Sequence, residues 1–174
     1  MKIITLLLTL FLTGCSTMSV TDYKDRKPTL VLEEYFSGKH KAYGVFQDRF
    51  GMVRREFNVD IVGNWDEQKQ TLTLVEDFAY KDGATEQRIW TIRKTAENKY
   101  EGEAAGTVGV AKGETSGNAF HWRYQFNLPV NGKTWKVSFD DWMWLQDDRV
   151  LFNKATIKRF GIRLGDVYIF FEKL

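Results

Sequence analysis

Across most of this chain, apolar and polar residues alternate with a period of two. In residues 53–65, for example, Phe57, Val59 and Ile61 are separated by Asn58 and Asp60. Successive side chains of a β-strand point to opposite faces of a sheet, so this pattern predicts strands with one packed face and one solvated face. The first run begins at residue 41, and others follow to the C-terminus at 53–65, 72–80, 88–92, 100–110, 120–126, 135–143, 150–157 and 166–173.

The turns between these runs are short, which favours antiparallel neighbours. Asp82-Gly83 and Asn131-Gly132 are typical of two-residue hairpin turns. About nine such strands in one open sheet would leave two unpaired edges and an uncovered apolar face, whereas closure into a barrel removes both problems. We therefore predict an all-β fold, an antiparallel up-and-down, lipocalin-like barrel of about nine strands. A β-sandwich is the alternative, although the chain lacks the long connections of a Greek key.

One segment before the strands has a different period. Residues 30–36 carry apolar side chains at 30, 31, 32, 35 and 36, a helical spacing that ends at Gly38. We expect this one short N-terminal helical segment to plug or flank the barrel. Trp142 and Trp144 are expected to point outward, where they either contact a partner or a membrane surface or lie beneath residues 30–36. We favour the covered arrangement.

The N-terminus has the features of a bacterial lipoprotein signal. Lys2 precedes an apolar run over residues 3–12, which is too short for a membrane-spanning helix of about 20 residues. The run ends in Leu12-Thr13-Gly14-Cys15, where a branched residue and two small residues precede the only cysteine. This pattern predicts cleavage between Gly14 and Cys15 and acylation of the Cys15 thiol. The alternatives are a plain secreted protein and a cytosolic protein with a buried thiol.

Three segments follow from this interpretation. Residues 1–14 are the lipoprotein signal peptide, residues 15–28 a lipidated tether, and residues 29–174 the lipocalin-like barrel domain. Membrane lipid is then a partner through acylated Cys15. Ser16 takes the place of the aspartate that commonly retains lipoproteins at the inner membrane, so we expect the periplasmic face of the outer membrane.

Charge and residue types exclude several classes of function. Without Lys2 the chain has 24 basic and 23 acidic residues and no polybasic run, so neither nucleic acid nor acidic lipid headgroups are expected partners. His40 and His121 are the only histidines, too few for a zinc or copper site. The sequence has neither a G-x-S-x-G nor a phosphate-binding motif. We predict no catalytic residue, no metal and no cofactor, and a protein that is not an enzyme.

A few charged residues share the predicted inward face of the strands with aromatic and aliphatic ones. By their place in the alternation, these are Arg55, Glu76, Arg88 and Asp141. Buried charges are costly unless they are paired and hydrogen-bonded. They therefore either pair across adjacent strands or meet the polar head of a ligand whose apolar part lies among tryptophans. The candidate ligand-binding residues are Arg55, Glu76, Arg88, Trp90, Trp122, Trp135 and Asp141.

Several short motifs resemble one known family. They are Glu34-Tyr35-Phe36-x-Gly38, Asp48-Arg49-Phe50-Gly51, Arg88-x-Trp90, Gly113 through Gly117-Asn118-Ala119, Asp140-Asp141-Trp142-Met143 and Asn153. Together they cover most of residues 30–174, and they are similar to the proteobacterial lipoproteins classified as domain of unknown function 3833. The resemblance implies a lipidated, lipocalin-like domain and assigns no catalytic residues.

These observations favour one function and leave two alternatives open. The leading hypothesis is a lipid-anchored periplasmic lipoprotein whose barrel binds an amphiphilic or apolar small ligand. The first alternative is a non-catalytic structural or envelope-assembly module with a packed barrel interior. The second is a hydrolase that uses inward carboxylates such as Glu76 and Asp141. A carrier requires an interior cavity of about 300 Å³ or more with an open mouth, whereas a packed interior supports the structural module.

Overall fold

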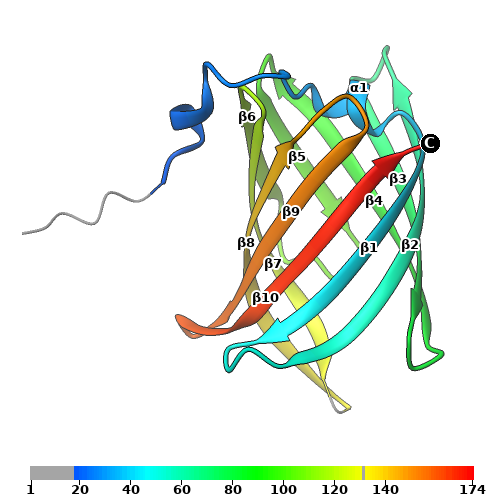
Figure 1. Cartoon of the computed structure of the whole chain (residues 1–174), viewed down its shortest axis with the longest axis vertical. Helices are drawn as coiled ribbons and strands as arrows, with labels where there is room; N and C mark the ends of the chain where they lie inside the picture. The colour runs from blue at the N-terminus through cyan, green and yellow to red at the C-terminus, as the bar shows by residue number, and fades with distance from the viewer. Residues whose placement is uncertain (1–17, 131) are drawn as a thin grey trace, which may run out of the picture.

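The fold is a closed antiparallel β-barrel (Figure 1). The computed structural model describes residues 18–130 and 132–174. The predicted signal peptide, which ends at Gly14, and the predicted lipidation site, Cys15, lie outside the described residues. Each strand pairs with its neighbours in sequence, and β1 pairs with β10 to close the wall. The elements are η1 (Val20–Tyr23), α1 (Leu32–Phe36), β1 (Gly38–Asp48), β2 (Val53–Asp66), β3 (Thr71–Tyr80), β4 (Thr85–Ala96), β5 (Lys99–Ala104), β6 (Ala111–Ser116), β7 (Ala119–Val130), β8 (Lys133–Leu145), β9 (Val150–Arg159) and β10 (Ile162–Lys173).

The all-β, up-and-down, lipocalin-like architecture predicted from the alternation is confirmed, but the wall has ten strands instead of about nine. The additional strand is β6, which falls in none of the predicted runs, and the run predicted over residues 100–110 covers β5 and the turn after it. β5 ends at Ala104 and β6 begins at Ala111, with a turn between them. Gly106 and Gly109 in this turn have φ angles of 97° and 72°, which glycine adopts without steric cost. Small residues that imitate a strand pattern therefore form a strand break.

A short helix closes one end of the barrel, which we call the closed end (Figure 1). α1 forms where the helical segment is predicted and buries Leu32 and Phe36. Glu33 attaches the helix to the wall, since its carboxylate accepts hydrogen bonds from Lys94 Nζ at 2.5 Å and the Tyr100 hydroxyl at 2.8 Å. Burial alone would raise the pKa of Glu33, but these hydrogen bonds lower it overall. The carboxylate therefore stays charged and holds the plug in place.

The C-terminal end of α1 lies directly on β2 at Gly63. A β-carbon at this position would lie 1.7 Å from the carbonyl oxygen of Phe36. Any side chain would push the helix off the strand, so the plug depends on a glycine that the alternation of β2 does not mark.

η1 packs on the outer wall near the closed end. Val20 is buried, and the Tyr23 ring lies 6.0 Å from Trp142 and 6.4 Å from Trp144. The two tryptophans are covered, as we favoured, but the expectation that residues 30–36 cover them is wrong, because η1 does so. Residues 30–36 turn inward because their apolar side chains fill the end of the barrel.

The core fills the barrel from the closed end. Its largest cluster combines α1 with inward side chains from all ten strands. The closed ladder and this core lie within residues 18–130 and 132–174. Neither helix in this part of the chain has the length and apolar character needed to cross a membrane.

Candidate functional site

The barrel contains a cavity of about 770 Å³. Every strand except β5 and β6 contributes to its lining, and Leu32 and Phe36 of α1 form its floor at the closed end. The opposite end, which we call the open end, carries the hairpin turns β1–β2, β3–β4, β7–β8 and β9–β10 (Figure 1). Arg54 and Pro129 are exposed there and also line the cavity, so the cavity reaches solvent at the open end. Its volume lies within the usual range for small-molecule sites.

Most of the cavity wall is aromatic or aliphatic. Trp90 on β4 lies 5.6 Å from Trp122 and 5.3 Å from Tyr124, both on β7, in edge-to-face contacts that hold the rings in place. Trp122 fits because the neighbouring strand carries Gly113, where a β-carbon would lie 2.3 Å from the indole. Phe57 and Phe78 continue the aromatic wall on β2 and β3.

Two carboxyl groups, Glu76 on β3 and Asp141 on β8, line this apolar cavity. Burial raises the pKa of each to about 7. The side-chain amide of Asn153 donates to Asp141 and to the carbonyl oxygen of Trp142, which fixes the carboxyl group in place. A hydrogen bond with Tyr124 also favours the charged form of Asp141 but does not overcome burial. Near pH 7 each carboxyl group can therefore either donate or accept a proton.

Arg88 supplies the positive charge inside the cavity. It lies opposite Glu76 in the β3–β4 ladder, but its Nη2 donates to Glu86 at 2.5 Å. Burial raises the pKa of Glu86, but Arg88 lowers it overall, so Glu86 carries the negative charge of the pair. The buried Nε of Arg88 has no hydrogen-bond partner.

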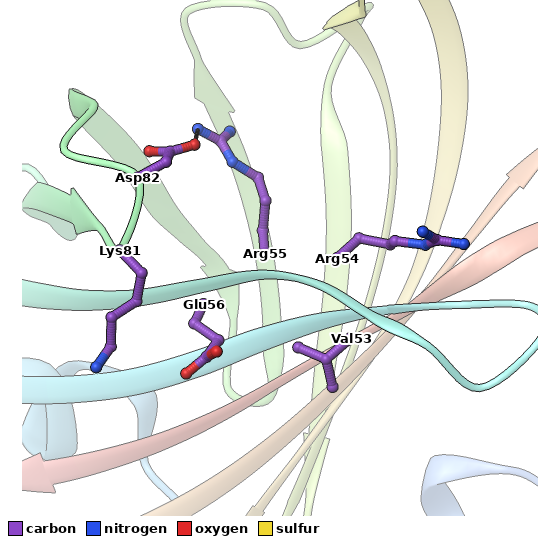
Figure 2. A pocket seen from close by; sticks show the side chains of 6 residues that line it. All are labelled: Val53, Arg54, Arg55, Glu56, Lys81 and Asp82. Carbon is purple, nitrogen blue, oxygen red and sulfur yellow. Dashed lines mark hydrogen bonds and ion pairs between the residues drawn. The ribbon is translucent and has the colours of Figure 1, made fainter.

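Arg55 lies at the open end rather than deep in the barrel. Its Nη2 lies 3.3 Å from Asp82, and its guanidinium stacks 3.7 Å above the Tyr80 ring. Figure 2 shows the Arg55 side chain directed at Asp82 and the Arg54 side chain directed away from both. These residues line a small outer pocket of about 150 Å³, whose other members are Val53, Glu56 and Lys81. The two inward arginines thus pair with Glu86 and Asp82, in place of the predicted pairing with Glu76 or Asp141.

Six of the seven candidate ligand-binding residues line the one cavity: Arg55, Glu76, Arg88, Trp90, Trp122 and Asp141. Trp135 does not line it, although its partner in the β7–β8 ladder, Leu128, does. The alternation places Trp135 on the correct face, but its ring packs against the Phe126, Val137 and Ile157 cluster and lies 4.3 Å from the guanidinium of Arg159. Whether these residues bind a ligand stays a prediction.

Sequence reasoning missed Tyr80, Tyr124 and Asn153 as members of this site. Tyr124 alternates with Trp122 and Phe126, a signal that could have included it. The inward position of Asn153 follows from the alternation of β9 in the same way. Tyr80 ends its strand, and the alternation alone does not indicate how far the cavity extends towards the open end.

The two histidines occupy separate places. His40 Nε2 lies 2.8 Å from the carbonyl oxygen of Tyr35, and burial lowers its pKa. His121 Nε2 lies 2.8 Å from Asp140 on the outer wall. Among residues 18–130 and 132–174, no group of three or more His, Cys, Asp or Glu side chains is arranged to hold a metal ion.

The closed wall, the helical plug and the interior cavity together define a lipocalin-like barrel. The chain belongs to the family described as protein of unknown function (DUF3833), which matches residues 9–173. A comparison with curated proteins finds no match. Among solved structures, the S-type phycobiliprotein lyase CPES from Guillardia theta is similar, with a TM-score of 0.60 and 10% sequence identity over 82% of this chain and 90% of that chain. At this identity the likeness shows the fold alone.

Proposed function

We propose that the barrel binds an amphiphilic small ligand, with its apolar part among the aromatic side chains and its polar part at Glu76, Arg88 and Asp141. The observation that carries this proposal is the cavity of about 770 Å³, which is largely apolar and has a few polar groups on facing strands. A packed interior, as the structural-module alternative requires, does not accommodate a cavity of this size. The phycobiliprotein lyase has a similar fold, which is consistent with a small-ligand function.

The polar groups suit a ligand whose head both donates and accepts hydrogen bonds. A carboxyl group with a pKa of about 7 can donate when protonated and accept when charged. The guanidinium of Arg88 lines the same cavity and supplies a positively charged donor. A hydroxyl, amide or carboxylate head on an apolar tail meets these requirements.

A cavity-filling substitution tests this proposal. Ala155 lines the cavity beside Asp141, and Phe at this position would occupy the ligand volume. Ala79 on β3 is exposed on the outer face and provides the matched control. We expect Ala155→Phe to weaken binding of a fluorescent fatty acid at least tenfold, which corresponds to a loss of about 1.4 kcal/mol in binding free energy. We expect Ala79→Phe to leave the binding within about twofold. Unchanged binding by Ala155→Phe would refute cavity binding.

A second candidate is an enzyme that uses Glu76 and Asp141 for proton transfer. The near-neutral pKa of both groups, inside an open cavity, favours it. Turnover of a bound amphiphilic ester that disappears in Glu76→Gln, with binding retained, would support the enzyme over the carrier.

We also propose that Cys15 carries the lipid anchor and that the protein lies in the cell envelope, at the periplasmic face of the outer membrane. Cys15 and Met18 are three positions apart, so their Cα atoms lie at most about 10 Å from each other in a fully extended chain. The chain from Val20 onward packs on the wall near the closed end. The closed end would then face the anchoring bilayer, and the cavity mouth would face away from it.

A further inference from the structure

Two neighbouring hairpin tips at the open end expose large apolar side chains. Phe50 and Met52 on the β1–β2 turn are 76% and 57% exposed, and Phe160 and Ile162 on the β9–β10 turn are 87% and 58% exposed. Single exposed apolar residues are common, but several together on protruding turns mark an interaction surface. We call residues 48–55 and 158–166 the lip of the barrel.

The two tips form one surface because β1 pairs with β10. The backbone N–H of Arg49 donates to the carbonyl oxygen of Leu164 at 2.9 Å, which ties one turn to the other. In Figure 1 the two turns lie side by side at the end opposite α1. Arg54, which belongs to the lip, also lines the cavity, so the lip borders the cavity mouth.

The lip carries a concentrated positive charge. It contains six Arg and Lys side chains against two carboxylates, Asp48 and Asp166. Both carboxylates form ion pairs, with Arg54 and Arg163, and Arg55 pairs with Asp82 of the β3–β4 turn. Arg49, Lys158 and Arg159 form no ion pair with the described residues and supply the free positive charge of the lip. The formal net charge of the whole chain is only +2, so the remainder of the molecule is net negative. The positive charge is therefore a local property of the open end.

Cations and apolar rings are interleaved on the lip. The guanidinium of Arg49 lies 4.8 Å from the Phe50 ring, and that of Arg159 lies 4.9 Å from the Phe160 ring. Apolar side chains that enter the acyl boundary, beside cations that remain at the headgroups, are the arrangement by which proteins bind bilayer surfaces. Anionic headgroups complement the charge of such a surface.

We propose that the lip docks on an anionic lipid bilayer, which brings the cavity mouth to the membrane surface. Given the proposed anchor at the closed end, this bilayer is a second one, distinct from the bilayer that holds Cys15. An amphiphilic ligand then passes between the second bilayer and the cavity without crossing open water. The docking step itself does not depend on the identity or presence of a ligand.

A single fluorescent label at each end tests the proposal. Residues 18–174 contain no cysteine, so Phe50→Cys introduces one thiol on the lip for an environment-sensitive dye. Leu174→Cys is the matched control, since Leu174 is apolar, 72% exposed and hydrogen-bonded to Lys39 at the closed end. With vesicles containing phosphatidylglycerol, we expect a blue shift and intensity gain at position 50 and none at position 174. Vesicles of phosphatidylcholine alone should give little change at either position.

Three outcomes would overturn the proposal: equal changes at positions 50 and 174, no change at position 50, or a change at position 50 that grows with protein concentration in the absence of vesicles. The last result would indicate a second copy of the chain on the lip. In the Phe50→Cys background, Arg49→Gln with Lys158→Gln should weaken vesicle binding about fivefold for each charge removed. The same changes at Lys39 and Lys99, exposed at the closed end, should leave binding unchanged.

Discussion

Glu76 and Asp141 are held in the cavity near the point of half-ionisation. Their environment is apolar, and the one buried cation nearby, Arg88, is engaged by Glu86. Such groups cost stability when they are charged, because unfolding would return them to water. The polar head of the proposed ligand would offset this cost.

The pH dependence of stability tests this interpretation at Glu76. Burial raises its pKa from 4.5 to about 7 in the folded state, so between these values the folded protein keeps a proton that the unfolded chain has lost. Stability should therefore fall as pH rises through this window. Glu76→Gln removes the Glu76 contribution to this fall and leaves that of Asp141, so at pH 8 we expect the variant to be more stable than the wild type by up to about 3 kcal/mol, with little difference at pH 4.5.

Thermal melts of both proteins from pH 4.5 to 8, without ligand, provide the measurement. Glu103→Gln, an exposed position on β5, should leave the pH profile unchanged. Parallel profiles for the wild type and Glu76→Gln would show that Glu76 does not keep its proton in the folded state.

At the scale of elements, α1 closes one end of the barrel and so forms the floor of the cavity. It has only five residues and would not be stable alone. Contacts with the wall stabilise it: the Glu33 ion pair, the bond between His40 and the Tyr35 carbonyl, and the close approach to Gly63. A helix held only by tertiary contacts is sensitive to a change in the strand beneath it.

Gly63→Ala tests this dependence. The new methyl group would lie 1.7 Å from the Phe36 carbonyl oxygen, so α1 must move. We expect a loss of about 2–4 kcal/mol in the free energy of unfolding and faster amide exchange in residues 32–36. The control is Gly83→Ala, which meets no atom within 4 Å and should cost only about 1 kcal/mol for its positive φ. Equal amide exchange in the two variants would contradict a plug that rests on Gly63.

At the scale of the whole molecule, the two ends of the barrel differ in every respect that bears on function. The closed end carries α1 and adjoins η1, whereas the open end carries the cavity mouth and the basic, apolar lip. Strands of 10–14 residues, tilted as in other barrels, separate the ends by roughly 30 Å. The proposed anchor and the proposed docking surface are thus at opposite ends.

This polarity can be measured in the lipidated chain. We expect a quencher in the acyl region of a phosphatidylcholine nanodisc to quench a dye at Leu174→Cys more strongly than a dye at Phe50→Cys. The physical reason is the short reach from Cys15 to the closed end. Cys15→Ala should abolish attachment to the nanodisc. Stronger quenching at position 50 would contradict the orientation.

Much of the fold was predictable because β alternation is a local property. The inward face of each strand could be read residue by residue, so six of seven candidate site residues line the cavity. The predicted count is one strand short because β6 lies outside the predicted runs, and small residues extend the run over residues 100–110 into a turn. Trp135 does not line the cavity because periodicity gives the face of a residue but not the side chains it packs against, here the Phe126 cluster and Arg159.

The sequence by itself determined the wall of the barrel, its inward face and the candidate lipidation signal, since each depends on neighbours within a few residues. Tertiary structure alone decided the volume of the cavity, the choice of Glu86 over Glu76 as the partner of Arg88, and the cover on Trp142. It also assembled the lip from turns more than 100 residues apart, although the sequence has no polybasic run. These properties arise when distant segments meet, because burial and local electric fields depend on contacts that no stretch of sequence contains.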